Sequence, residues 1–200
     1  MRDAADSEAG RTKAERLRVR GTSVTGEFGL GHQAARLAWY VVQGTLFRFP
    51  LRRCDWWRIC LLRAFGARIG RRCIVRRTAI VEAPWNLVLG DDVIIGDRTI
   101  LYSIAKVVIG DRTMVSQGAH LCAGDHDMRR IDLPLRRIPV SIGHDAWICA
   151  DTFVGPGVDI GDGTVLGARS AAFRDLPAWT VCIGTPARPV RARTISSDGR

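Results

Sequence analysis

Hydrophobic residues recur every six positions through the C-terminal half of the chain. The clearest run begins at Ile142 and continues through Ile148, Val154, Ile160 and Leu166. Glycine follows four of these five residues, and the fifth place of each hexad is small or β-branched. Neither the 3.6-residue period of a helix nor the two-residue period of a strand fits this spacing.

The same phase appears upstream in three blocks that begin at Ile69, Leu89 and Ile109, 20 residues apart. A six-residue period predicts a solenoid in which each hexad forms a short strand and a corner. Three hexads close one coil, and the leading aliphatic side chains stack inside. Two generic hairpins with glycine turns are the alternative. We therefore predict an all-β fold, a parallel β-helix.

The segments outside the repeat divide the rest of the chain. Residues 1–30 lack apolar periodicity and predict a disordered basic tail. Aromatic residues gather in the helical segment 31–66, which Pro50 divides into two helices that can cap the first coil. The repeat predicts a β-helix over 67–186, and 187–200 is expected to be a C-terminal tail.

The repeat breaks once, because Leu121 and Ile142 are 21 residues apart and 21 is not a multiple of six. A loop at about 127–139 must therefore project from the coil. Loops that project from a rigid scaffold are common places for binding sites.

Charge is unevenly distributed along the chain. The net charge is +10, but residues 1–80 hold 17 basic and 6 acidic residues, whereas residues 81–200 hold 13 and 14. This distribution does not favour a nucleic-acid partner, which would need a basic surface over the folded domain. The basic helix at 51–65 has two interpretations. Its apolar face closes the first coil, or its Arg and Trp residues contact an anionic membrane as a peripheral helix.

The cysteines and the N-terminus indicate the compartment. No two of the six cysteines have C-x-x-C spacing, so neither a zinc knuckle nor a thioredoxin-like motif is present. The first residues are polar and acidic, unlike a signal peptide, and the longest apolar stretch, 37–47, is too short to span a bilayer. We expect a cytoplasmic protein, with the inner face of the membrane as the alternative location.

Several motifs resemble the hexapeptide-repeat acyltransferases, which fold as left-handed parallel β-helices. Among them, the chain is most similar to sugar O-acetyltransferases of the colanic-acid-biosynthesis type. The resemblance covers about 55–192 and implies acetyl-CoA as co-substrate, a saccharide acceptor, a role in exopolysaccharide biosynthesis and a homotrimer. The motifs are Trp57-Arg58 with LLRAFGARIG (61–70), LCAGDHD (121–127), VGPGV (154–158), and DLP (175–177) with GTPAR (184–188).

The resemblance implies that His126, just before the projecting loop, is the catalytic histidine. Acetyl transfer to a hydroxyl needs a base, and imidazole has a suitable pKa. Asp125 and Asp127 flank His126, and either is a candidate to fix its tautomer or raise its pKa. A structural histidine, or a covalent route through Cys122, is the alternative. His120 is expected to be structural.

The resemblance also implies where acetyl-CoA binds. Arg174, Arg188 and Arg191 match basic positions that contact the cofactor in the family, and guanidinium groups suit its phosphates. Ala150 and Ala168 match positions whose backbone holds the pantetheine arm. Ordinary solvated arginines are the alternative.

The acceptor side departs from the family pattern. Trp147 projects from a hexad, where related enzymes place a tryptophan near the acceptor; an exposed or inter-subunit aromatic is the alternative. Those enzymes also place an asparagine beside the acceptor, whereas this chain has Ser103 there, with Asn86 one coil earlier as a substitute. No metal is expected, because His120 and His126 are six residues apart and the zinc-binding relatives need a spacing of five.

The main hypothesis is an acetyl-CoA-dependent O-acetyltransferase that acts on a saccharide hydroxyl with His126 as general base. One alternative is an N-acetyltransferase that acts on an amino sugar or a xenobiotic. The other is a non-catalytic scaffold that binds a polyanion through its basic N-terminus.

Overall fold

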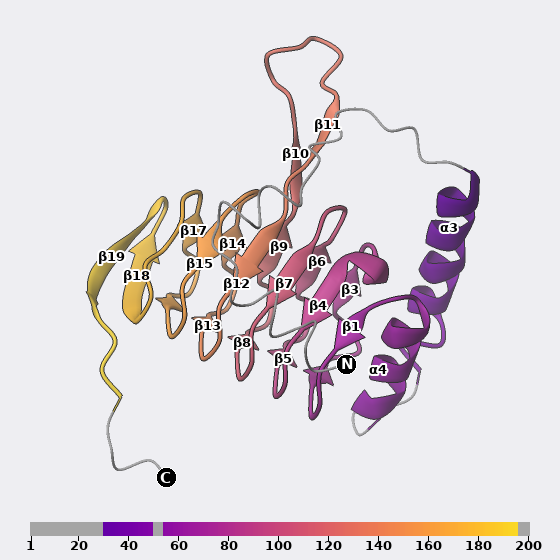
Figure 1. Ribbon diagram of the computed structural model, residues 1–200, viewed down its shortest axis with the longest axis horizontal. Coiled ribbons are helices and arrows are strands. Elements are labelled where there is room, and N and C mark those ends of the chain that lie inside the picture. Colours follow the sequence, from indigo (N-terminus) through magenta and orange to yellow (C-terminus); the bar gives the residue numbers. More distant parts are fainter. Residues whose placement is uncertain (1–29, 50–53, 196–200) are drawn as a thin grey trace.

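The computed structural model describes residues 30–49 and 54–195. Two helices, α3 (Leu30–Gly44) and α4 (Asp55–Ala64), precede a series of short strands wound into a parallel β-helix (Figure 1). The predicted parallel β-helix is thus confirmed. The tail predicted at 1–30 lies outside the described residues except for Leu30, and so does Pro50.

Three sheets form the three faces of the solenoid, and the central coils give one strand to each. Sheet A contains β1 (Arg68–Ile69), β4 (Leu87–Leu89), β7 (Val107–Ile109), β12 (Val140–Ile142) and β15 (Asp159–Ile160). Sheet B contains β2 (Ile74–Val75), β5 (Ile94–Ile95), β8 (Met114–Val115), β13 (Trp147–Ile148), β16 (Val165–Leu166), β18 (Thr180–Gly184) and β19 (Ala187–Ala192). Sheet C contains β3 (Ile80–Val81), β6 (Ile100–Tyr102), β9 (His120–Cys122), β14 (Phe153–Val154) and β17 (Ala171–Ala172).

The leading residue of each hexad points into the solenoid. In sheet A, the parallel register places Ile69, Leu89, Ile109, Ile142 and Ile160 one above another, and each is at most 8% exposed. Each coil therefore buries its aliphatic side chains only against its neighbours.

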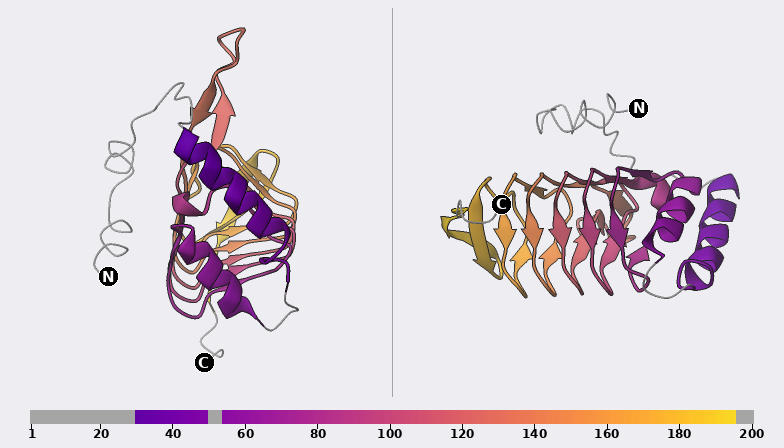
Figure 2. Two further views of the ribbon diagram at one scale, coloured as in Figure 1. Left: turned by 90° about the vertical axis from the view of Figure 1, so that its right-hand side faces the viewer. Right: turned by 90° about the horizontal axis from the view of Figure 1, so that it is seen from below.

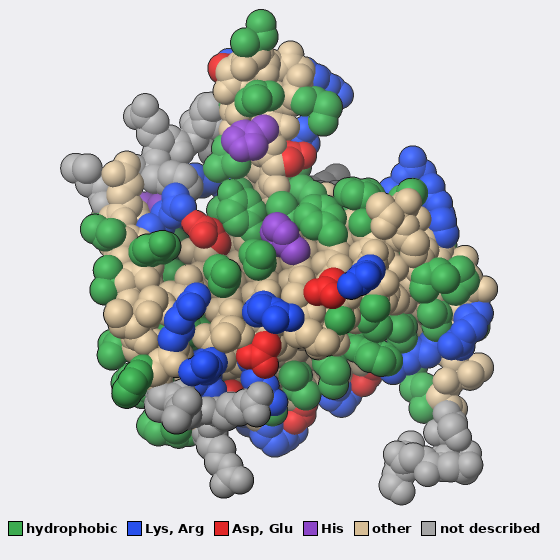
Figure 3. Space-filling model, turned by 180° about the vertical axis from the view of Figure 1, so that it is seen from behind, with side chains coloured by type: hydrophobic (Ala, Val, Ile, Leu, Met, Phe, Trp, Pro, Cys, Tyr) green, Lys and Arg blue, Asp and Glu red, His purple; other side chains and the backbone are tan. Residues whose placement is uncertain are grey.

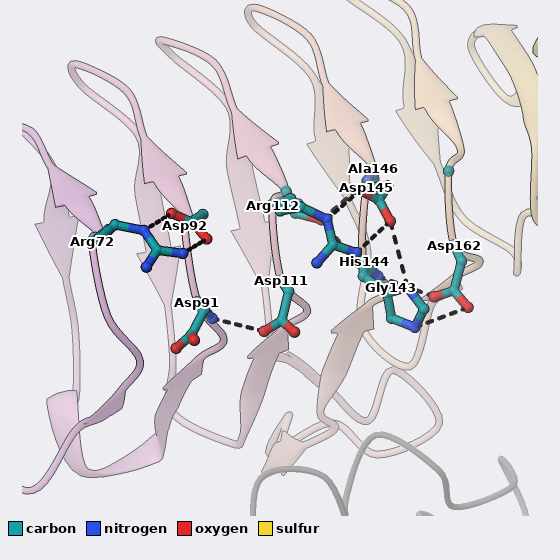
Figure 4. Close-up of polar contacts among 12 residues, drawn as sticks. Arg72, Asp91, Asp92, Asp111, Arg112, Gly143, His144, Asp145, Ala146 and Asp162 are labelled. Atoms are coloured by element: carbon teal, nitrogen blue, oxygen red, sulfur yellow. Dashed lines mark hydrogen bonds and ion pairs between the residues drawn. The ribbon is translucent and has the colours of Figure 1, made fainter. Parts of the chain in front are cut away.

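Polar side chains at the corner between sheets A and B connect successive coils. Asp91 accepts the backbone N–H of Arg71 at 2.8 Å, and Asp111 accepts that of Asp91 at 2.7 Å. Arg112 and Asp145 form an ion pair at the same corner, with Nε and Oδ1 2.7 Å apart (Figure 4). The carboxylates of Asp91 and Asp111 thus satisfy backbone donors that the corners leave outside the strand ladders.

The two helices lie across the first coil (Figure 2) and form its cap. The indole Nε1 of Trp39 on α3 donates to the Val81 carbonyl at 2.6 Å. On α4, Arg58 is 1% exposed, its Nε donates to the Val75 carbonyl at 2.7 Å, and its Nη2 pairs with Asp55 at 2.7 Å. The buried charge is thus compensated by hydrogen bonds, as burial requires.

The structure changes two of the predicted boundaries. The expected tail begins with strand β19, which pairs antiparallel with β18 because the chain reverses direction between Gly184 and Ala187. The expected loop has an antiparallel stem, β10 (Gly124–His126) and β11 (Leu135–Arg137), that projects away from the coils (Figure 1). The stem begins before residue 127, because residues 124–126 leave the coil to pair with 135–137.

Candidate active site

His126 is the last residue of β10, on the stem of the projecting hairpin, and its side chain is exposed. Its Nδ1 atom lies 2.5 Å from the carbonyl oxygen of Leu133 on the other side of the hairpin. A carbonyl oxygen can only accept a hydrogen bond, so Nδ1 carries the proton. The Nε2 atom therefore keeps its lone pair and can accept a proton from a substrate.

The backbone of the hairpin end holds that carbonyl in place. Leu133 has φ +42°, in the left-handed region that few non-glycine residues adopt. Its N–H donates to the Arg130 carbonyl at 3.1 Å, and the N–H of Asp127 donates to the Pro134 carbonyl at 3.0 Å. The partner of His126 is thus fixed by turn geometry, which the sequence pattern did not reveal.

The two aspartates that flank His126 have other partners, and neither of them holds its Nδ1 atom. Asp125 pairs with Arg136 across the hairpin, with Oδ1 and Nε 3.4 Å apart, and it points to the opposite face because side chains alternate along a strand. The Oδ1 of Asp127 accepts the N–H of Arg129 at 3.1 Å and stabilises the turn. Both aspartates support the hairpin, and the Leu133 carbonyl sets the tautomer.

His120 and Cys122 lie on the outer side of β9, before the hairpin. The Nε2 of His120 is buried without a hydrogen-bond partner, its ring meets Phe153 edge to face at 5.4 Å, and burial lowers its pKa. Burial raises the pKa of the Cys122 thiol, and its Sγ lies 3.1 Å from the Gly124 carbonyl. A protonated thiol is a weak nucleophile, so this environment does not favour the covalent route.

The structure contradicts the substrate-binding role predicted for Ser103. This residue is fully buried, and its hydroxyl donates to the Ala83 carbonyl at 3.0 Å and accepts the Ala83 N–H at 2.9 Å. Its hydroxyl therefore joins two coils and is closed to an acceptor. Asn86 is half-buried, and its Nδ2 donates to the carbonyls of Ser103 and Ile104 at 2.9 and 3.1 Å. These two bonds fix the side-chain amide and direct its Oδ1 away from those carbonyls.

Trp147 is 45% exposed and lies on sheet B, whereas the strand that leads to His126 belongs to sheet C. It pairs in register with Met114, and its Nε1 donates to Ser116 Oγ at 2.9 Å. A groove borders it on the outer side of sheet B, and sequence reasoning did not find this groove. Residues that line the groove include Arg76, Arg77, Arg98, Met114, Ser116 and Gln117.

The predicted cofactor residues lie toward the C-terminal end of the solenoid. Ala150 and Ala168 occupy turns on successive coils, joined by a hydrogen bond from the Arg169 N–H to the Ala150 carbonyl at 2.9 Å. Arg174 and Arg188 are exposed. Arg191 is also exposed, and its Nη1 lies 3.4 Å from the Ala192 carbonyl. Exposed guanidinium groups fit the phosphates of a coenzyme A molecule. Among the described residues, no group of three or more His, Cys, Asp or Glu is arranged to hold a metal ion.

Comparison with known proteins identifies the family. No family model matches the chain. It is 41% identical over 173 residues to WcaF of Escherichia coli (strain K12), a candidate colanic acid biosynthesis acetyltransferase, and the match covers 86% of this chain and 95% of WcaF. It is 36% identical over 66 residues to the galactoside O-acetyltransferase of the same organism, covering 33% of this chain and 32% of that protein.

Solved structures agree with this fold. A hexapeptide-repeat acetyltransferase of Vibrio cholerae, solved with acetyl coenzyme A, is 22% identical with a TM-score of 0.79, covering 92% of this chain and 100% of that one. A galactoside acetyltransferase in complex with coenzyme A is 21% identical with a TM-score of 0.71, covering 92% of each chain. The identity to WcaF extends over nearly the whole relative, and we conclude that the chain belongs to the hexapeptide-repeat acetyltransferases.

Proposed function

We propose that this protein is an acetyl-CoA-dependent O-acetyltransferase that acts on a saccharide hydroxyl in exopolysaccharide biosynthesis. The observation that supports His126 as general base is the hydrogen bond from its Nδ1 to the Leu133 carbonyl, which leaves Nε2 free to accept a proton. The similarity to WcaF supports the saccharide acceptor. A cytoplasmic location suits a supply of acetyl-CoA.

His126 acts in both halves of the transfer. Its Nε2 takes the proton of the acceptor hydroxyl as that oxygen attacks the acetyl carbonyl carbon. The carbon–sulfur bond then breaks, and the imidazolium returns the proton to the departing sulfur. Acetyl-CoA, when bound, supplies the thioester. The Leu133 carbonyl accepts the Nδ1–H throughout and stabilises the transient positive charge on the ring.

The remaining residues position the two substrates. The Arg174 and Arg188 guanidinium groups, with Arg191 beside them, bind the phosphates of the cofactor. The turns at Ala150 and Ala168 present backbone groups to its pantetheine arm. The reaction step requires no metal ion.

Trp147 lies on sheet B, whereas the hairpin that carries His126 follows a strand of sheet C, so an acceptor site that uses both needs two copies of the chain. We therefore include a homotrimer in the proposal, with each site between adjacent subunits. The exposed apolar side chains of Met114 and Trp147 on sheet B are suitable material for such a contact.

The experiment is titration calorimetry of acetyl-CoA against wild type, Arg188→Ala and a control, Arg72→Ala, whose guanidinium pairs with Asp92 far from the predicted cofactor arginines. We expect saturable binding that weakens about tenfold or more in Arg188→Ala, as loss of a charge-assisted contact predicts, and no change in the control.

Acceptor assays distinguish the alternatives. Transfer to hydroxyl sugars in preference to amino sugars or amine xenobiotics supports O-acetylation, and the opposite preference identifies an N-acetyltransferase. Absence of acetyl-CoA binding by folded wild type rejects the proposal and favours the polyanion-binding scaffold.

A further inference from the structure

Helix α3 is apolar on both of its sides. One side packs on the solenoid through Trp39, which is 1% exposed, and the other presents Leu37, Tyr40 and Val41, which are 66%, 75% and 56% exposed. The only charged residue of the helix is Arg36, whose guanidinium pairs with Glu82 of the solenoid. The outer side of α3 thus lacks the charged residues that the solvent-facing side of a surface helix normally carries.

Residues after α3 extend this surface. Leu46, Phe49 and Trp56 are 49%, 80% and 66% exposed. We name the combined surface the apolar end face; it comprises Leu37, Tyr40, Val41, Leu46, Phe49 and Trp56. Figure 2 shows α3 at the extreme end of the molecule, and Figure 3 shows hydrophobic side chains along that end with Lys or Arg side chains beside them. Large apolar side chains exposed together at one end of a molecule are typical of an interaction site.

The charge of this segment limits the kind of partner. Residues 30–66 contain six arginines and one acidic residue, Asp55. Arg58 pairs with that carboxylate at 2.7 Å, and Arg76 approaches it at 3.9 Å, so its charge is neutralised locally. Arg48 is exposed next to Phe49. The surface therefore combines aromatic and aliphatic groups with uncompensated positive charge, which complements an anionic partner.

The geometry indicates an interfacial position. The 15 residues of α3 extend about 22 Å, less than the roughly 30 Å of a bilayer core, and no described helix is long and apolar enough to cross a membrane. Exposed Tyr and Trp beside Arg are the residues that bind the headgroup region. We propose that the apolar end face binds the surface of an anionic lipid bilayer.

This surface differs from the one predicted from the sequence. The earlier alternative placed the membrane contact on 51–65, but α4 directs Arg58, Ile59 and Leu62 into the fold. The outer side of α3 provides most of the contact instead, with Trp56 as the contribution from α4. The inference does not depend on the acceptor or on the catalytic role of His126.

The test is sedimentation of full-length protein with vesicles of phosphatidylcholine alone or with one-third phosphatidylglycerol. We expect binding to the anionic vesicles and at least about tenfold weaker binding by Leu37→Gln/Tyr40→Ser, because two inserted side chains are lost. The matched control is Ile195→Gln, which replaces an equally exposed residue, also 66%, close to the C-terminus and should bind like wild type.

Three results would overturn the inference. If the wild type does not sediment with anionic vesicles, a lipid partner is excluded. Equal binding by wild type and Leu37→Gln/Tyr40→Ser means that arginines alone attract the vesicles. A smaller oligomer in light scattering of the double variant means that the face joins copies of the chain. Acetyl-CoA binding, measured on the same variants, should remain unchanged and reports separately on the proposed enzymatic function.

Discussion

The imidazole of His126 is held by the backbone of Leu133, with Nδ1 and the carbonyl oxygen 2.5 Å apart. No side chain sets the tautomer, so the arrangement tolerates changes of side chain at residue 133. It does not tolerate loss of the imidazole.

We expect His126→Ala to lower kcat by about 10² to 10⁴, because the acceptor hydroxyl loses its base. Leu133→Gly should keep kcat near wild type, because the carbonyl remains and glycine adopts φ +42° without steric cost. Steady-state kinetics measures both kcat values, with an acceptor identified in the acceptor assays. Near-normal turnover by His126→Ala would reject the proposed mechanism.

Ser103→Ala should lower the free energy of unfolding by about 1–3 kcal/mol, because the buried N–H and carbonyl of Ala83 lose their partner. Urea denaturation measures this loss. Acceptor KM should not change, since the hydroxyl is closed to substrate. Thr180→Ala, at a more exposed hydroxyl, is the control and should be nearly neutral. A raised acceptor KM with an unchanged free energy of unfolding in Ser103→Ala would instead support the substrate-binding role for Ser103.

Subunit mixing tests whether one site uses two chains. His126→Ala and Trp147→Ala should each be inactive or nearly so alone. The two variants are then refolded together in equal amounts. If His126 and Trp147 of one site come from different subunits of a cyclic trimer, random assembly produces intact copies of both residues in about a quarter of the sites. Activity of the mixture near that fraction supports shared sites. A mixture as inactive as its parents shows that each site lies within one chain.

Acid should weaken the corner between sheets A and B. The hydrogen bond from Arg112 lowers the pKa of Asp145. A lowered folded-state pKa means that the stabilisation is present above the unfolded value and is lost as pH falls through the folded value. Asp145→Asn should therefore lower stability by at most about 1 kcal/mol at neutral pH and by less at about pH 3. Thermal melts at both pH values check this. The control is Asp132→Asn, because the ion pair of Asp132 with Arg130 is more exposed and should contribute little at either pH. An equal loss of stability in Asp145→Asn at both pH values would contradict the prediction.

The repeat was predictable because each hexad carries its own packing signal. The leading residues of three hexads, Ile148, Val154 and Leu166, are all fully buried, as their spacing predicted. The partner of His126 was not predictable, since it is a backbone atom whose position depends on a left-handed leucine. Ser103 was misassigned because the position of a residue in its hexad indicates where its side chain points. That position does not indicate whether a neighbouring coil already uses the side chain, as the backbone of Ala83 uses the Ser103 hydroxyl.

Stacked coils also give the molecule a fixed length. Strands β3, β6 and β9 are neighbours in sheet C, and the hairpin with His126 follows β9. Adjacent strands are about 4.8 Å apart, and a packed helix adds about 10 Å, so along the solenoid axis the level of His126 is some 20–30 Å from the outer side of α3. A protein docked through its cap would therefore hold His126 at about this height above the lipid headgroups.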